Sequence, residues 1–210
     1  MKKSKHIIFN KDIQSKIVKS QSSKHQTWNI NTDAQTFKFG GKVADEINLL
    51  IEFDVVPSYL SWLNVDKLQL GMDFELFFNS LLNNKILSYE HSKGGSINLL
   101  TNNIEITVPY SNYPLKETEI RIADTPTELY SQEWEGNTNK LNSTPIWVQE
   151  EEILTCPKCQ NRMEFLIQLT SGLPDLNEKN NFEIMFGNDG ELYGFWCNKD
   201  LISSYIWQST

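Results

Sequence analysis

Three cysteines and one aspartate in the C-terminal third of the chain have the types and spacing of metal ligands. Cys156 and Cys159 form a Cys-Pro-Lys-Cys turn, and Cys197 is followed three residues later by Asp200. A zinc ribbon holds its metal between two such turns, whose four ligand atoms form a tetrahedron. Zinc accepts an aspartate oxygen, although a carboxylate is a harder ligand than a thiolate. The sequence therefore predicts a candidate zinc site at these four residues.

Two metal-free interpretations compete with that site. Because the second pair lacks its last cysteine, the favoured interpretation is a degenerate knuckle, a β-turn with buried thiols that has lost its metal. Native mass spectrometry would then find little or no zinc, and a full equivalent that disappears in Cys156→Ser would contradict this interpretation. A redox role is disfavoured, because the chain from Met163 onward is typical of a strand, whereas a catalytic thiolate needs a helix N-terminus.

The elements that must position these turns are mostly short strands. Apolar runs rich in branched and aromatic residues predict strands at 47–55, 74–78, 85–89, 96–100, 104–110, 119–123, 163–169, 182–186, 190–197 and 202–207. Helices are predicted at 6–19, after Pro57 and at 125–134. This mixture predicts an α+β fold with mainly antiparallel sheets and a few helices.

The order of features is similar in two parts of the chain, which predicts an internal duplication of a β-rich unit. Three pairs of landmarks are separated by 116, 119 and 118 residues, namely Phe53 and Leu169, Gly71 and Gly190, and Phe78 and Trp196. The predicted organisation is a basic segment at 1–25, a first repeat with an insertion at 26–142, and a second repeat with the cysteine turn at 143–210. Two such units would bury their apolar faces against each other in one compact domain.

Charge is distributed unevenly along the chain. Residues 1–25 contain seven of the 19 basic residues and one of the 27 acidic residues, so the rest carries 12 basic and 26 acidic groups. An acidic body repels nucleic-acid phosphates, which leaves the basic segment as the one part suited to contact them. The simplest structure for that segment is a solvated terminus.

The C-terminal third resembles the YwqG-like bacterial proteins of unknown function. The matching stretches are WVQ at 147–149, CPKC at 156–159, MEFLIQ at 163–168, FGNDG at 186–190 with Tyr193 and Phe195, and WQ at 207–208. The chain departs from the family pattern with phenylalanine at 186, serine at 209 and aspartate at 200. Residues 37–78 match more loosely. The resemblance implies an α+β fold with two repeats and brings no enzymatic activity with it.

No catalytic set can be assembled from the sequence, because the three histidines, His6, His25 and His91, stand outside any motif. The leading hypothesis is a non-enzymatic protein of an immunity or accessory type whose acidic surface binds a basic protein partner. Two alternatives stay open: a degenerate zinc-ribbon module that contacts nucleic acid through residues 1–25, and an enzyme with a pocket between the repeats.

The chain is expected to be cytoplasmic and without a membrane segment. No run approaches the roughly 20 apolar residues of a membrane helix. The apolar run near the start ends after three residues, which is short for a secretory signal. Three cysteines, two of them in one turn, fit metal binding or free thiols better than a disulfide framework.

Overall fold

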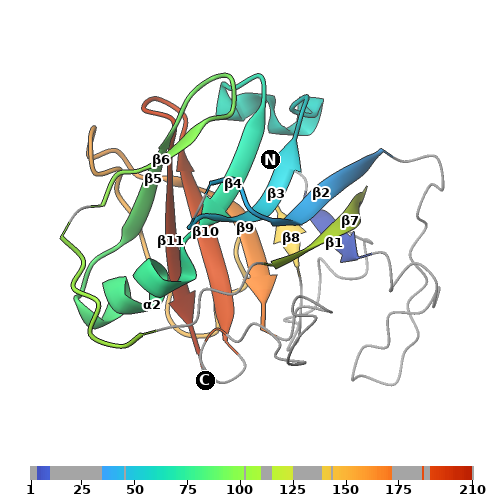
Figure 1. Ribbon diagram of the computed structural model, residues 1–210. Helices are drawn as coiled ribbons and strands as arrows, with labels where there is room; N and C mark the ends of the chain where they lie inside the picture. Colours follow the sequence, from blue (N-terminus) through green and yellow to red (C-terminus); the bar gives the residue numbers. More distant parts are fainter. Residues whose placement is uncertain are drawn as a thin grey trace.

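The computed structural model describes residues 4–9, 35–44, 46–101, 103–109, 115–124, 139–142, 144–171, 186 and 190–209. Within these ranges eleven strands form one sheet, accompanied by two helices (Figure 1). The strands are β1 (Lys5–Phe9), β2 (Thr36–Gly41), β3 (Asn48–Phe53), β4 (Leu68–Met72), β5 (Leu87–His91), β6 (Ile97–Leu99), β7 (Leu115–Asp124), β8 (Lys140–Leu141), β9 (Glu164–Thr170), β10 (Glu191–Cys197) and β11 (Ile202–Gln208). The helices are the 3-10 helix η1 (Ser58–Leu63) and the α-helix α2 (Phe74–Leu82).

The sheet is antiparallel throughout and curls until its two ends approach each other. The strand order is β4-β3-β2-β7-β1-β8-β9-β10-β11-β5-β6, and every hydrogen-bonded pair of neighbours is antiparallel. The end strands β4 and β6 lie near each other. The N–H groups of Asp66 and Lys67, just before β4, donate to the carbonyl of Lys93 between β5 and β6, at 3.0 and 3.3 Å. The curled sheet therefore encloses most of the core.

The α+β prediction is wrong, because strands dominate the part of the chain that the structure describes. There, 46% of the residues belong to strands or bridges and 11% to helices, so the fold is β-rich. Antiparallel pairing was predicted correctly. The helix predicted at 125–134 and the strand predicted at 182–186 lie outside the described residues, apart from Phe186. No helix among the described residues is long and apolar enough to cross a membrane.

The stretch after β4 is helix α2, although its alternating apolar residues predicted a strand. Asp73 caps the helix, because its carboxylate accepts a hydrogen bond from the Leu76 N–H at 3.0 Å. Phe74 and Phe77 are three residues apart and both bury their rings, which is the spacing of one helix face. The capping aspartate and this period of three to four outweigh the period of two.

The internal duplication fails at its third landmark. Phe78 lies in helix α2, whereas its proposed counterpart Trp196 lies in strand β10. The two units also do not form separate layers. Strands β5 and β6 of the proposed first repeat extend the sheet beyond β11 of the second repeat, while β2, β3, β4 and β7 lie on the other side of β8.

The N-terminal strand β1 lies in the middle of the sheet, between β7 and β8. Residues 6–9 were predicted to begin a helix and belong instead to this strand; residues 10–19 lie outside the described part. Ile7 and Phe9 are buried in the core, and Lys5 forms an ion pair with Asp124. This part of the basic segment is therefore structural rather than a solvated terminus.

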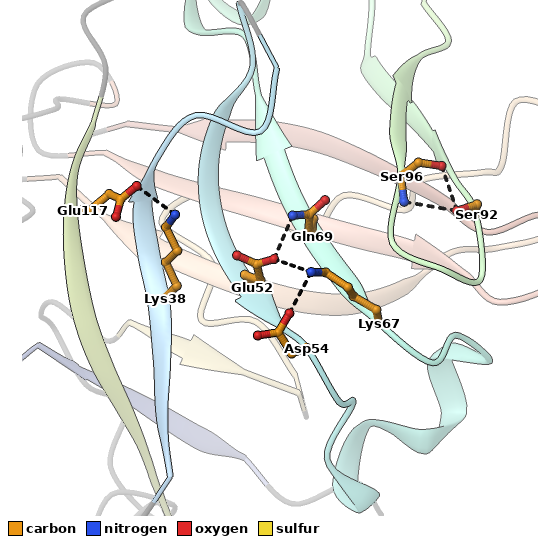
Figure 2. A network of polar contacts seen from close by, with 8 residues as sticks. All are labelled: Lys38, Glu52, Asp54, Lys67, Gln69, Ser92, Ser96 and Glu117. Atoms are coloured by element: carbon orange, nitrogen blue, oxygen red, sulfur yellow. Dashed lines mark hydrogen bonds and ion pairs between the residues drawn. The ribbon is translucent and has the colours of Figure 1, made fainter.

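The outer face of β2, β3 and β4 carries a network of polar contacts (Figure 2). Lys67 Nζ lies 2.7 Å from both Asp54 Oδ1 and Glu52 Oε1, and Lys38 Nζ lies 2.8 Å from Glu117 Oε1. The hydrogen bonds to Asp54 and then Glu52 raise the pKa of Lys67. Because most of these groups are exposed, water and salt screen the pairs, and each stabilises the fold by at most about 1 kcal/mol.

Strands β9 and β10 bury both of their faces, and a β-bulge determines which side chains reach the second face. Gly194 pairs with Ile167 and Phe195 pairs with Phe165, so Leu166 is the extra residue of the bulge. Ile167 then faces the main core, while Phe165 faces a second cluster together with Phe195. Since side chains alternate along β10, Cys197 lies on the same face as Phe195. This second face carries the candidate site.

Candidate metal centre

The Cys-Pro-Lys-Cys turn is a tight loop that leads into β9. Thr155 and Arg162 close it with an isolated β-bridge. Within it, the N–H of Cys156 donates to the carbonyl of Asn161, and the N–H of Gln160 donates back to the carbonyl of Cys156, both at 2.9 Å. Gln160 adopts the left-handed conformation, with φ of 60°. The chain thereby reverses direction immediately after the second cysteine.

The second turn connects β10 to β11 and repeats this backbone feature. Cys197 ends β10 and pairs with Ile202, the first residue of β11. Leu201, the residue after Asp200, has φ of 55° and matches Gln160, the residue after Cys159. A left-handed leucine costs roughly 1–2 kcal/mol. The fold holds it there in part through the His91 N–H, which donates to the Leu201 carbonyl at 2.8 Å.

The two turns bring all four predicted ligands together. The Cys156 Sγ lies 3.2 Å from Asp200 Oδ2, the Cys197 Sγ lies 3.7 Å from the same oxygen, and the Cys159 Sγ lies 3.7 Å from the Cys197 Sγ. One potential ligand atom from each residue lies within 4.8 Å of all the others. In the described part of the chain, these residues form the group of Cys, His, Asp and Glu that could hold a metal ion.

Three of the six distances among these ligand atoms are close to those around a tetrahedral metal ion. With metal–sulfur bonds of about 2.3 Å and a metal–oxygen bond of about 2.0 Å, ideal tetrahedral angles separate two sulfurs by about 3.8 Å and a sulfur from the oxygen by about 3.5 Å. The distances from Cys156 Sγ to Asp200 Oδ2, from Cys197 Sγ to Asp200 Oδ2 and from Cys159 Sγ to Cys197 Sγ lie within about 0.3 Å of these values. All three cysteines are free of disulfides, so each sulfur remains able to bind a metal.

Backbone donors surround the sulfurs. The N–H groups of Cys159 and Lys158 act to lower the pKa of Cys156, and the N–H of Asn161 acts to lower the pKa of Cys159, against the larger effects that raise both. Burial raises the pKa of Cys156 to about 12, and the hydrogen bond to Asp200 raises the pKa of Cys159. Hydrogen bonds from Cys159 and then Cys156 lower the pKa of Asp200. Because a metal ligand must be a thiolate, metal binding would release the thiol protons.

The cluster lies at the boundary between a small apolar core and solvent. Cys156 is fully buried and Cys197 is 5% exposed, whereas Cys159 and Asp200 are half-buried. Leu154, Met163 and Phe165 are among the apolar residues packed around the cysteines. A metal here would join the 155–162 loop to the β10–β11 turn, two segments that share no strand pairing.

The histidines take no part in this cluster. His91 is buried on β5, where its Nε2 lies 2.8 Å from the Ser203 Oγ and its ring lies 4.8 Å from the Trp196 ring. Burial lowers the pKa of His91 to about 3, and burial followed by the charge of Lys140 lowers the pKa of His6 to about 4. Both histidines are therefore neutral at pH 7, and His25 lies outside the described residues.

Sequence reasoning missed the side chains that attach residues 144–150 to the sheet. Gln168 accepts from the Ile146 N–H at 2.9 Å and donates to the Ile146 carbonyl at 3.1 Å. The Tyr193 hydroxyl donates to the same carbonyl at 2.8 Å, and Gln208 accepts from the Gln149 N–H at 2.9 Å. Gln168, Tyr193 and Gln208 occur in the stretches that carry the family resemblance, which was the one available signal. They fix the segment that leads into the cysteine turn.

Two buried ionisable residues, Lys140 and Glu191, lie near the same segment. Lys140 Nζ donates to the Thr144 carbonyl at 2.7 Å, and Gln168 donates to Glu191 Oε2 at 3.1 Å. Burial lowers the pKa of Lys140 to about 8 and raises the pKa of Glu191 to about 7. With both groups below 9% exposed, this pair supports the covering segment and offers no surface to a ligand.

The fold and the cluster define an antiparallel-sheet protein with three thiols and one carboxylate at metal-ligand spacing. No family model, no curated protein and no solved structure matches the chain. The resemblance to the YwqG-like proteins therefore stays a prediction.

Proposed function

We propose that this chain is a non-enzymatic protein-binding protein whose fold is stabilised by a structural zinc ion at Cys156, Cys159, Cys197 and Asp200. The observation that carries the zinc proposal is the convergence of these four groups within 4.8 Å of one another, from two turns that each end in a residue with positive φ. This proposal departs from the degenerate, metal-free knuckle that the sequence favoured, because the Asp200 carboxylate lies 3.2 Å from Cys156 Sγ and 3.7 Å from Cys197 Sγ, at the position of a fourth ligand.

The ligand types favour zinc and a structural role. Three soft thiolates select zinc over magnesium or calcium, which prefer oxygen ligands. Four protein ligands complete a tetrahedron, whereas a catalytic zinc site keeps one position open for water or substrate. The other arrangement with catalytic residue types, His91 with Ser203, is 4% and 1% exposed, so a substrate cannot reach it.

Cobalt substitution tests the metal site directly. We expect the purified chain to bind one equivalent of Co²⁺ and to develop the intense visible bands of a tetrahedral ion and the near-ultraviolet bands of thiolate ligation. Zn²⁺ should displace the cobalt. Asp200→Ala should bind cobalt more weakly, whereas Asp66→Ala, which removes an exposed carboxylate elsewhere, should match the wild type. Absence of tetrahedral bands in the wild type would reject the site.

The protein-binding part of the proposal is supported by charge. Outside residues 1–25 the chain carries 26 acidic and 12 basic residues, a balance that attracts a basic partner and orients its approach. Contact with nucleic acid through residues 1–25 has less support, because Lys5 pairs with Asp124 and lies 4.9 Å from the Tyr59 ring centroid.

Salt dependence tests whether charge drives the capture of a partner. The zinc-loaded chain, immobilised through its C-terminus, should capture a basic protein from a lysate of its own cells at low salt and release it as salt rises, since ions screen exposed charges. Capture that does not depend on salt, or capture of nucleic acid alone, would contradict the proposed partner. Neither result would bear on the metal site, which the cobalt spectra test separately.

A further inference from the structure

The three cysteines of the candidate metal centre differ in their exposure to solvent. Cys156 is fully buried and Cys197 is 5% exposed, whereas Cys159 is half-buried at the end of the Cys-Pro-Lys-Cys turn. The residues on either side of it, Lys158 and Gln160, are exposed. A small polar molecule dissolved in water therefore meets Cys159 before it meets the other two cysteines.

The ligand atoms divide into two close pairs. The Cys159 Sγ lies 3.7 Å from the Cys197 Sγ, and the Cys156 Sγ lies 3.2 Å from Asp200 Oδ2. A disulfide bond separates its two sulfurs by about 2.05 Å, so the first pair would form one after an approach of about 1.7 Å. The second pair holds one sulfur and one carboxylate and forms no such bond.

The backbone around the first pair permits this approach. Cys197 is fixed at the end of β10, where it pairs with Ile202. Cys159 lies in the 155–162 loop, and the loop's backbone hydrogen bonds, from Cys156 to Asn161 and from Gln160 to Cys156, stay within the loop. A small shift of the loop as a unit keeps these bonds and brings the two sulfurs together.

A bound zinc ion would make Cys159 reactive toward oxidants. A thiol that ligates zinc is deprotonated, and the thiolate is the nucleophilic form of cysteine. Susceptibility to oxidation increases with thiolate character and with exposure. Among the three cysteines, Cys159 combines zinc ligation with access from solvent.

We propose that hydrogen peroxide oxidises Cys159 and Cys197 to a disulfide and thereby releases the zinc ion. This proposal rests on the zinc site of the proposed function. The Cys159 thiolate attacks one peroxide oxygen, the O–O bond breaks, and hydroxide leaves, so that Cys159 becomes a sulfenic acid. The Cys197 thiolate then attacks the Cys159 sulfur, which forms the S–S bond and expels a second hydroxide. Two thiolates together lose two electrons, and one peroxide is reduced to two hydroxide ions.

The disulfide removes two of the four zinc ligands and keeps the cross-link. Cys156 and Asp200 alone do not complete the tetrahedral site that a structural zinc ion requires, so the ion leaves. The new S–S bond joins the 155–162 loop to the end of β10, close to where the metal joins the loop to the β10–β11 turn. Peroxide therefore releases zinc without separating the two segments, and reduction of the disulfide restores the site.

Zinc release by peroxide tests the proposal on the full zinc-loaded chain. One equivalent of hydrogen peroxide, added without oxygen, should release about one equivalent of zinc to a colorimetric chelator, and a dithiol reductant should restore zinc binding. The oxidised chain should melt about 5 °C or more above the reduced, metal-free chain, because the disulfide replaces the metal as a cross-link. Lys158→Gln changes a neighbour of Cys159 and no ligand, so it should release zinc with the wild-type stoichiometry.

Tryptic mapping identifies the disulfide, because cleavage after lysine and arginine places the three cysteines in separate peptides. Cys156 falls in peptide 141–158, Cys159 in peptide 159–162 and Cys197 in peptide 180–199. We expect peroxide to link 159–162 to 180–199. A link between 141–158 and 159–162, or between 141–158 and 180–199, as the main product would overturn the proposal.

Two variants test the order of the steps independently of the metal. Cys156→Ser keeps both sulfurs of the proposed disulfide and should still link the two peptides with excess peroxide. Cys197→Ser removes the second nucleophile, so the sulfenic acid at Cys159 should persist and react with dimedone on peptide 159–162. Dimedone labelling of Cys156 in place of Cys159 would contradict the proposed attack.

Cobalt spectra distinguish failure of this proposal from failure of the zinc site. Tetrahedral cobalt bands that disappear with one equivalent of peroxide support both the site and its oxidation. Bands that persist in a tenfold excess of peroxide would overturn the oxidation and leave the site intact. A wild type without tetrahedral bands would reject the zinc site, and the release of zinc from it would fall with it.

Discussion

Replacing Cys156 by serine is expected to abolish stoichiometric zinc binding and to lower the melting temperature by about 8–16 °C. A metal at about a thousand times its dissociation constant stabilises the native state by about 4 kcal/mol. In a domain of this size, each 1 kcal/mol corresponds to about 2–4 °C. Cys156 is fully buried and contacts Asp200. Water and other side chains therefore have no access to take the place of its sulfur as a metal ligand.

A chelator separates loss of the metal from damage by the substitution. A strong chelator should lower the melting temperature of the wild type to nearly that of Cys156→Ser and should leave the variant unchanged. Lys158→Gln, in the same turn, keeps all four ligands and loses only the exposed ion pair with Glu90, so its melting temperature should shift by no more than about 2–4 °C. A wild type that ignores the chelator would contradict a structural metal.

Replacing Trp196 by alanine is expected to destabilise the fold by about 4–6 kcal/mol. Trp196 is fully buried in the main core, and removal of a buried tryptophan costs about 3–5 kcal/mol. Its indole Nε1 also donates to the Leu63 carbonyl at 3.1 Å, which ties η1 to the sheet. Loss of that donor adds about 1 kcal/mol, because the buried carbonyl loses its partner.

Urea unfolding followed by far-ultraviolet circular dichroism measures this effect. Trp196→Phe should recover most of the lost stability, since it keeps an aromatic ring against His91 and loses the hydrogen bond. Trp147→Ala provides the comparison at a half-buried tryptophan that packs on Tyr193 at 4.8 Å, and it should cost less than half as much. Equal losses at positions 147 and 196 would contradict the assignment of Trp196 to the main core.

The apolar pattern of the sequence correctly predicted the strands around the site. It failed where a single side chain elsewhere in the chain determined the secondary structure. The apolar runs at 163–169, 190–197 and 202–207 form β9, β10 and β11. A strand that is buried on both faces is apolar at nearly every position, so its sequence is easy to recognise. At 74–78 the capping by Asp73 converted an alternating pattern into helix α2. At 104–108 the alternation was present, but Asn79 and Asn83 took the place of a neighbouring strand.

The four candidate ligands could be predicted from their spacing in the sequence. The distances between their ligand atoms could not be predicted in this way. The distance between Cys156 and Asp200 depends on how the 155–162 loop folds over β10 and β11. The segment that leads into this loop, residues 144–150, is held by Gln168, Tyr193 and Gln208. These are contacts between residues far apart in the sequence, which no local period encodes. The position of β1 between β7 and β8 is of the same kind.

That position of β1 has a consequence for the order of events during synthesis. Residues 5–9 leave the ribosome well before their hydrogen-bonding partners on β7 and β8, which are made more than one hundred residues later. The two flanks of the sheet stay unconnected through β1 until then, and closing so long a loop is entropically unfavourable and slow. Strand β1 thus waits for β7 and β8 before it can join the sheet, although it precedes both of them by more than one hundred residues.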